Sequence, residues 1–213
     1  MKAIIFDLQG TLVENGVFPS PIKQVKYVLG VRDTFHDYVP VFESIFMTRK
    51  FASLADAFKE VATGFDVQID DLMIERLVGI WNKNKLLSKL YLDTIDVLKD
   101  LKKDYKLILI ANIDCFSRDV IEKFHLEEYF DKIFFSYETG ILKNDERFYV
   151  NILEQTGLDH KEVIAVGDSV ESDMKSALNA GIKCVLIDRN NRMDFDTKIS
   201  RLADLRESIE KLQ

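Results

Sequence analysis

The sequence has few cysteines and histidines, and this scarcity excludes several kinds of protein. Its 213 residues include two cysteines and three histidines. Cys115 and Cys184 lie far apart and neither belongs to a C-x-x-C pair, which argues against a disulfide framework and a metal or redox site of that type. The histidines are scattered, without the spacing of metal ligands. We therefore expect a cytoplasmic protein held together by a hydrophobic core, since 47% of the residues are apolar.

Long apolar runs and clusters of positive charge are also missing. No stretch reaches the ~18 uninterrupted apolar residues of a membrane helix, and the apolar run that follows Lys2 is too short for a signal peptide. Lys and Arg total 29, Asp and Glu total 36, and the net charge is −7. We expect neither a membrane nor nucleic acid as a partner. An anionic small molecule stays compatible with this charge, because a bound divalent cation can reverse the local field.

The organisation of the chain changes along its length. Residues 2–8 are predicted to form a buried strand, because apolar residues occupy successive positions. Residues 16–87 show helical periodicity, with Ser20 expected to cap one helix and Ser53 another. Pro40 is expected to interrupt a further, less regular helical piece. This region therefore predicts a helical bundle.

After Tyr91, helices and strands alternate. The expected helices are 91–104, 114–124, 145–156 and 171–180, and the expected strands are 105–111, 132–135, 162–166 and 183–187. Strands separated by helices predict βαβ units and a parallel sheet. In such sheets ligands bind beyond the carboxyl ends of the strands. The last segment, 198–212, predicts a short strand and an amphipathic helix that cover the edge of the sheet.

Polar residues stand at these strand ends. Asp7 ends the first strand, Asn112 follows the second, Lys143 comes after the third, and Asp168 and Asp173 follow the fourth. Carboxylate oxygens are the hard ligands that Mg²⁺ prefers, and the starts of the following helices favour phosphate. A carboxylate displayed beside a metal and a phosphate is a candidate nucleophile, which points to Asp7.

The order and spacing of these residues resemble the motifs of the haloacid dehalogenase-like (HAD) hydrolase superfamily. The family's first motif, D-x-D-G-T, stands here as Asp7-Leu-Gln-Gly-Thr11, and its fourth, G-D-S-x-x-x-D, as Gly167-Asp-Ser-Val-Glu-Ser-Asp173. The third motif, a Lys often followed by Pro, stands as Lys143-Asn144, and the second, a Ser or Thr often followed by Asn, as Ala111-Asn112. The likeness covers residues 1–16 and roughly 88–190.

The resemblance implies an α/β fold and a division of the chain. Residues 1–16 and 88–213 would form a Rossmann-like core, in which a parallel sheet is flanked by helices. Residues 17–87 would form a helical-bundle cap inserted after the first motif. The partner implied is a small phosphorylated substrate, and the sequence carries no prediction of oligomeric state.

The resemblance also implies a Mg²⁺-dependent phosphohydrolase with a defined set of site residues. Asp7 would attack phosphorus to form an aspartyl-phosphate, and Lys143 would balance the charge of Asp7 and the phosphate. The implied Mg²⁺ ligands are Asp7, the backbone carbonyl of Gln9, Asp168 and Asp173, and the implied phosphate-binding residues are Thr11, Asn112 and Lys143.

Two positions depart from the family pattern. Gln9 replaces the second Asp of the first motif, and its amide can act neither as a general acid nor as a general base; loss of that function costs about 10²–10⁴ in rate. Ala111 lacks the hydroxyl of the second motif, a loss that costs up to about 10²–10³. We therefore expect a slow enzyme, or one specialised for good leaving groups such as acyl or aryl phosphates.

Two alternatives stay open. The chain could be a binding or regulatory protein with a decayed catalytic site, because the metal-ligand positions are kept while two chemical positions are changed. It could also be a metal-independent 2-haloacid dehalogenase, because such enzymes lack the second Asp of the first motif. The retained pair of Asp168 and Asp173 favours metal and phosphate over the second alternative.

Overall fold

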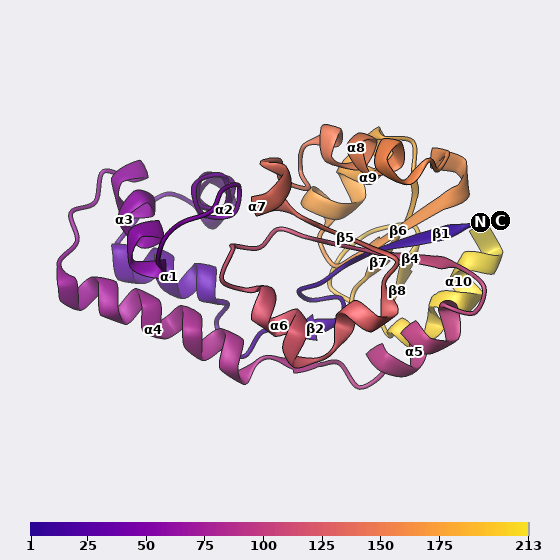
Figure 1. Ribbon diagram of the computed structural model, residues 1–213, viewed down its shortest axis with the longest axis horizontal. Coiled ribbons are helices and arrows are strands. Elements are labelled where there is room, and N and C mark those ends of the chain that lie inside the picture. The colour runs from indigo at the N-terminus through magenta and orange to yellow at the C-terminus, as the bar shows by residue number, and fades with distance from the viewer. Residues whose placement is uncertain (213) are drawn as a thin grey trace.

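The protein is built on a sheet of six parallel strands, described by a computed structural model that covers residues 1–212 (Figure 1). The strands lie in the order β5-β4-β1-β6-β7-β8. Their bounds are β1 (Ala3–Asp7), β4 (Lys106–Ala111), β5 (Lys132–Phe135), β6 (Val163–Gly167), β7 (Lys183–Ile187) and β8 (Lys198–Ile199). The chain adds strands on one side of β1 and then on the other. The carboxyl end of β1 is therefore the point where the strand order reverses, which is where such sheets bind ligands.

Helices cover both faces of this sheet, and the central strand is buried on both sides. Successive residues of β1 alternate between two hydrophobic clusters: Ile4 and Phe6 belong to one, Ala3 and Ile5 to the other. The first cluster also takes in α5 (Thr94–Leu101), α6 (Arg118–Lys123) and α10 (Leu205–Leu212), and the second takes in α8 (Glu146–Thr156) and α9 (Ser176–Asn179). The predicted Rossmann-like α/β fold is confirmed.

Several predicted helices differ from the structure at their bounds. The segment expected to be helical from 91 to 104 is α5, eight residues long, and α6 begins at Arg118 rather than at 114. The helix expected over 171–180 consists of a π-helical segment, η3 (Val170–Lys175), followed by α9. The remaining short elements are α7 (Ser136–Thr139) and the 3₁₀ turns η1 (Leu126–Tyr129), η2 (His160–Glu162) and η4 (Leu202–Asp204).

Four helices between β1 and β4 form a group that we call the helical insert: α1 (Pro21–Leu29), α2 (Phe35–Phe46), α3 (Leu54–Gly64) and α4 (Asp71–Leu87). Their apolar faces pack into a third hydrophobic cluster, in which Phe46 contacts the rings of Phe42, Phe58 and Trp81. The expected caps are present, because the Ser20 and Ser53 hydroxyls accept hydrogen bonds from backbone N–H groups three residues on. Pro40, by contrast, does not interrupt its segment and lies within the continuous helix α2.

The insert lies beyond the strand ends, at the opposite end of the molecule from the N-terminus (Figure 1). The chain enters and leaves it beside a small antiparallel ribbon made of β2 (Val13–Glu14) and β3 (Lys89–Leu90). Gly16 donates from its backbone N–H to the side-chain oxygen of Asn84 at 2.9 Å, which ties the start of the insert to its last helix. No helix in residues 1–212 combines the length and the hydropathy needed to cross a membrane.

Candidate active site

Three carboxylates meet at the carboxyl ends of β1 and β6. Asp7 is the last residue of β1, Asp168 follows β6, and Asp173 lies in η3; one carboxylate oxygen of each lies within 4.8 Å of the others. Two glycines permit this approach. A Cβ on Gly10, whose φ is +86°, would lie 1.9 Å from Asp168 Oδ2, and a Cβ on Gly167 would lie 2.4 Å from Asp173 Cγ.

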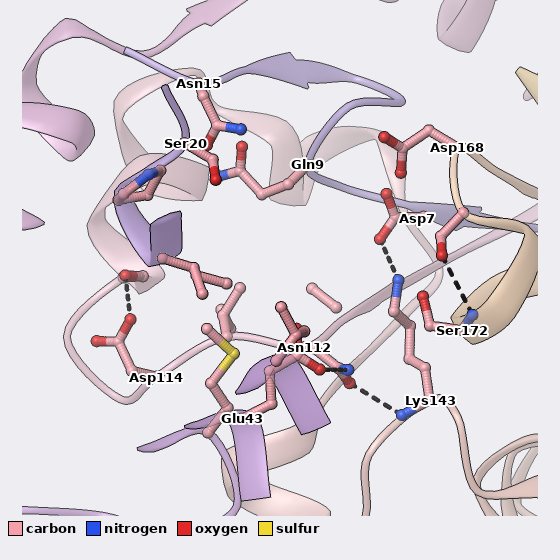
Figure 2. Close-up of a pocket in the computed structure, with 18 of the residues that line it drawn as sticks. Asp7, Gln9, Asn15, Ser20, Glu43, Asn112, Asp114, Lys143, Asp168 and Ser172 are labelled. Atoms are coloured by element: carbon pink, nitrogen blue, oxygen red, sulfur yellow. Dashed lines mark hydrogen bonds and ion pairs between the residues drawn. The ribbon is translucent and has the colours of Figure 1, made fainter. Parts of the chain in front are cut away.

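Lys143 joins two of these carboxylates. Its ammonium pairs with Asp7 Oδ1, as Figure 2 shows, and with Asp173 Oδ1 at 2.6 Å. Asp173 Oδ2 also accepts a hydrogen bond from the backbone N–H of Ser169 at 3.0 Å. Lys143 is 5% exposed and Asp173 is 1% exposed, so the pairs are shielded from water. This shielding strengthens their attraction and makes loss of either partner costly.

Burial and neighbouring charges shift the pKa values of Asp7, Asp168 and Lys143. Burial raises the pKa of Asp7 to about 6, although Lys143 opposes the shift. Burial, followed by repulsion from Asp7 and Asp173, raises the pKa of Asp168 well above its ordinary value. Burial alone would lower the pKa of Lys143, but attraction to Asp173 and Asp7 holds it well above the usual value. The cluster thus contains three carboxyl groups and one ammonium, which pairs with two of them, so negative charge is in excess.

The donor set fits a divalent cation. Asp7 Oδ2 is buried and has no hydrogen-bond partner among residues 1–212. Asp168, only partly buried, faces the same space from β6. Hard, anionic oxygens with one unpaired acceptor are what Mg²⁺ binds. Asp7, Asp168, Asp173 and the backbone carbonyl of Gln9 are the residues that could hold it.

A cavity of about 420 Å³ opens in front of these carboxylates, and we call it the strand-end cavity. It brings together most of the residues singled out from the sequence, namely Asp7, Gln9, Ala111, Asn112, Lys143 and Asp168. The insert supplies an apolar wall that includes Ile22, Val39, Pro40, Met47 and Trp81. Asp173 and Thr11 do not line the cavity. Asp173 reaches it through Lys143, whereas Thr11 is fully buried and its hydroxyl has no hydrogen-bond partner within residues 1–212.

Gln9 enters the cavity with an amide where the family pattern has a carboxylate. Figure 2 shows its side chain on the side of the cavity that carries Asn15 and Ser20. Its Oε1 is buried and accepts no hydrogen bond from the described part of the chain. An amide has no useful titration, so Gln9 offers polarity and a backbone carbonyl but moves no proton.

The cavity contains a carboxylate that no sequence motif indicated. Glu43, on α2 of the insert, accepts a hydrogen bond from Asn112 Nδ2 at 2.9 Å, and Asn112 Oδ1 accepts one from the backbone N–H of Lys143 at 2.9 Å. Burial in the cavity raises the pKa of Glu43 to about 7. One local signal could have found it, since Glu43 lies four residues from Val39 and from Met47, on a stripe that faces the cavity.

A second carboxyl group in the cavity is structural. This group belongs to Asp114, which lies between β4 and α6. It is almost fully buried and accepts hydrogen bonds from Trp81 Nε1 at 2.9 Å, from the backbone N–H of Phe116 and from the Ser117 hydroxyl. Because these donors engage both of its oxygens, Asp114 caps the turn before α6 and ties α4 of the insert to the end of β4.

The fold and the site define a class of protein: a parallel α/β protein whose acidic cluster lies at the reversal point of the strand order. The chain belongs to the haloacid dehalogenase-like hydrolase family, whose model matches residues 1–181. The predicted membership of this family is therefore confirmed, and the chain is a hydrolase.

Several known proteins are similar over nearly the whole chain. N-acylneuraminate-9-phosphatase of Mus musculus is 24% identical over 91% of this chain and 85% of its own length. Glyceraldehyde 3-phosphate phosphatase of Methanocaldococcus jannaschii is 25% identical over 100% of this chain and 99% of its own. A HAD family enzyme of Bacteroides thetaiotaomicron, solved in complex with magnesium and inorganic phosphate, has a TM-score of 0.64 at 20% identity and covers 92% of this chain and 98% of its own. At that identity the last comparison shows a shared fold.

Proposed function

We propose that this chain is a Mg²⁺-dependent phosphohydrolase that acts through an aspartyl-phosphate on Asp7. The observation that carries the proposal is the environment of the Asp7 carboxylate. One of its oxygens pairs with Lys143, and the other is unpartnered within residues 1–212 and lies beside the remaining carboxylates of the cluster. The similarity to two phosphatases supports the reaction class, and a related fold that binds magnesium and phosphate supports the cofactor.

Each residue of the cluster has a role in this reaction. Mg²⁺ bound by Asp7, the carbonyl of Gln9, Asp168 and Asp173 would neutralise the charge that builds up on the phosphoryl oxygens. Asp7 attacks phosphorus, and the bond to the leaving oxygen breaks. Lys143 balances the charge of Asp7 and of the phosphate. Asn112 lines the same cavity, and the amide N–H that it does not give to Glu43 can donate to a phosphate oxygen. Thr11 was predicted to bind phosphate, but its side chain is fully buried and does not line the cavity. We therefore propose that Thr11 supports the loop after β1 rather than contacting the phosphate.

The two departures from the family pattern, Gln9 and Ala111, would slow the hydrolysis of the substrate more than they would weaken the binding of Mg²⁺ and phosphate. Gln9 cannot protonate a leaving oxygen, and Ala111 places a methyl group where a hydroxyl would face the phosphate. Acyl and aryl phosphates need less protonation than alkyl phosphates, because their leaving oxygens are weaker bases. Because Gln9 provides no proton for the leaving oxygen, we propose that acyl and aryl phosphates are the best substrates.

We further propose that residues 17–87 act as a cap on a core made of residues 1–16 and 88–213. The insert provides the apolar wall of the strand-end cavity, opposite the carboxylates. A small phosphorylated substrate would place its phosphate at Asp7 and its organic part against Ile22, Met47 and Trp81. We infer a cytoplasmic enzyme from the free cysteines, which fit a reducing compartment.

The second candidate is a binding protein with a decayed catalytic site. It is favoured by Gln9 and Ala111, which remove two chemical groups while the carboxylate cluster and Lys143 stay intact. A metal-independent 2-haloacid dehalogenase accounts less well for the cluster. Its reaction needs no metal, and so it gives no role to Asp168 and Asp173 beside the unpartnered oxygen of Asp7.

The deciding experiment is a panel of acyl, aryl and alkyl phosphates assayed with and without Mg²⁺, together with 2-haloacids. We expect Mg²⁺-dependent phosphate release, fastest with acyl and aryl phosphates, and a loss of at least about 10³-fold in Asp7→Asn, which keeps the shape of the side chain. Mg²⁺ binding is measured separately by calorimetry. Binding of Mg²⁺ without hydrolysis of any ester would support the decayed protein, and metal-independent halide release would support the dehalogenase.

A further inference from the structure

We propose that Glu43 supplies the proton that Gln9 cannot, first as the general acid for the leaving oxygen and then as the general base for the attacking water. This inference rests on the proposed phosphohydrolase function. It assigns to the helical insert a catalytic residue of the reaction, in addition to the apolar wall of the cavity.

The first support is the position of Glu43. It lies on α2, within a continuous helix, and lines the same cavity as Asp7. Figure 2 shows its carboxylate beside Asn112, on the opposite side of the cavity from Gln9. A substrate phosphate at Asp7 would place its leaving oxygen away from Asp7 and toward the insert, because the attacking and leaving oxygens lie roughly in line.

The second support is how the side chain is held. Glu43 Oε2 accepts the hydrogen bond from Asn112, whose own oxygen is fixed by the backbone of Lys143. Glu43 Oε1 accepts no hydrogen bond from residues 1–212, so one oxygen is anchored and the other is available in the cavity. An anchored carboxyl group with one unengaged oxygen is the geometry that a general acid needs.

The third support is electrostatic. The charged groups that act on Glu43 are Lys143 and Asp7, which line the cavity, and Asp173, which pairs with Lys143. The cavity is also lined by His36 from the same helix and by Lys85, Asp114, Asp168 and Glu171. Burial raises the pKa of Glu43 to about 7, while the hydrogen bond from Asn112 and the charge of Lys143 lower it. Near neutral pH the group can therefore exist in both forms, as an acid and base in one cycle requires.

The chemistry balances as follows. In the first step Asp7 forms a bond to phosphorus, the bond between phosphorus and the leaving oxygen breaks, and the Glu43 proton passes to that oxygen, which departs as an alcohol. In the second step the Glu43 carboxylate takes a proton from water while the water oxygen attacks phosphorus. Asp7 is released as a carboxylate, Glu43 is protonated again, and the net reaction is ester plus water to alcohol plus phosphate.

The test is Glu43→Gln, because glutamine keeps an oxygen that can accept the hydrogen bond from Asn112 but holds no transferable proton. We expect kcat/KM for an alkyl phosphate such as glycerol phosphate to fall at least about 100-fold, because this constant reports formation of the aspartyl-phosphate and departure of the alcohol. The fall in kcat/KM for p-nitrophenyl phosphate should be less than about tenfold, because its leaving group needs little protonation. We expect kcat to fall for both substrates, because hydrolysis of the shared aspartyl-phosphate also needs Glu43 as its base. In the unmodified protein kcat/KM for the alkyl phosphate should decline as the pH rises through about 7, where Glu43 loses its proton, and the variant should lack this decline.

Equal losses of kcat/KM on both substrates, or a rise in KM with kcat unchanged, would assign Glu43 to positioning or recognition and overturn the proposal. Asp114→Asn is the matched control, because it alters another buried cavity carboxyl group that is fully engaged in structural hydrogen bonds. It should not change the ratio of the two substrates' rates.

A rescue experiment guards against a trivial loss of structure. Adding Gln9→Asp to Glu43→Gln places a new carboxyl group on the opposite wall, and we expect it to restore at least about tenfold of the alkyl phosphate activity. The absence of any rescue in a folded double variant would contradict the proton-transfer role. Failure of the proposed function looks different, because then the unmodified protein would release no phosphate from either substrate.

Discussion

The two walls of the strand-end cavity differ in how their functional groups are held. On the sheet wall, Asp7, Lys143 and Asp173 are almost fully buried and bind one another. On the insert wall, apolar side chains predominate, and Glu43 reaches across to Asn112 by a single hydrogen bond. The sheet wall is thus a fixed charge cluster, whereas the insert wall is mainly apolar, with Glu43, His36 and Lys85 as its titratable groups. In the proposed mechanism the sheet wall binds the phosphate and the insert wall acts on the leaving group, so the two tasks fall to different parts of the fold.

The largest effect should come from breaking the sheet wall with Lys143→Met. Removing the ammonium leaves Asp7 and Asp173 buried without their partner, and we expect a loss of about 3 kcal/mol in the free energy of unfolding without Mg²⁺. Added Mg²⁺ should recover part of the loss. Chemical denaturation measures both effects. The control is Lys211→Met, which removes an ion pair with Glu207 in which both side chains are largely exposed, and it should cost less than about 1 kcal/mol.

The pH dependence of metal-free stability should report the same cluster. Burial raises the pKa of Asp7 from 3.8 to about 6 and that of Glu43 from 4.5 to about 7, so the folded state binds more protons than the unfolded state in this window. Their contribution to stability is therefore present at low pH and is lost as the pH rises from about 4 through about 7. Saturating Mg²⁺ should flatten the decline. A metal-free stability that rises over this range would contradict the charge balance inferred for the sheet wall.

The third prediction adds an acid to the sheet wall. Gln9→Asp should raise Mg²⁺-dependent hydrolysis of alkyl phosphates about tenfold, because the new carboxyl group provides a second source of protons. The gain should be smaller with acyl phosphates, whose leaving groups need little protonation. Steady-state kinetics on the two substrate classes measure the difference, with Gln9→Glu as a control for the length of the side chain. An equal gain on both classes would show that position 9 does not act by proton transfer.

The fourth prediction concerns the tie between the walls. Trp81→Phe keeps an aromatic ring in the insert but removes the hydrogen bond to the buried Asp114. We expect a loss of about 1 kcal/mol in unfolding free energy and an increase in KM, because the insert is held less firmly over the cavity. A double-mutant cycle with Asp114→Asn isolates the interaction. Additive effects of the two substitutions would show that the hydrogen bond contributes no coupling between the walls.

The smallest effect should come from Ala111→Ser. Ala111 is buried at the end of β4 and lines the cavity, so a hydroxyl there can donate to a phosphate oxygen. We expect kcat to rise by about two- to fivefold, well below the full value of such a donor, because the site has evolved around a methyl group. Ala111→Val adds bulk without a donor and serves as the control. A similar gain in both variants would attribute it to packing rather than to hydrogen bonding.

The sheet wall was predictable from the sequence. A buried parallel strand is recognised from consecutive apolar residues, and its carboxyl end is the residue at which the apolar run stops. Asp7 and Asp168 could thus be assigned to one edge before any contact was known. The helices of the insert were also predictable, and Pro40 was misjudged because tertiary packing holds α2 together despite the missing N–H. The two-part nature of the segment after β6 could not be predicted from periodicity, because a π-helical segment of six residues is too short to show a period of its own.

The sequence alone determined the parallel sheet and the four strand-end residues around Asp7, because these depend on local patterns that repeat every two to four residues. Only the tertiary structure decided which face of the insert meets them. Glu43 and Asn112 are 69 residues apart in the chain, and Trp81 and Asp114 are 33 apart. Periodicity shows which side of a helix is apolar, but the crossing of one element over another depends on the packing of the whole core. That packing places a carboxyl group opposite Gln9.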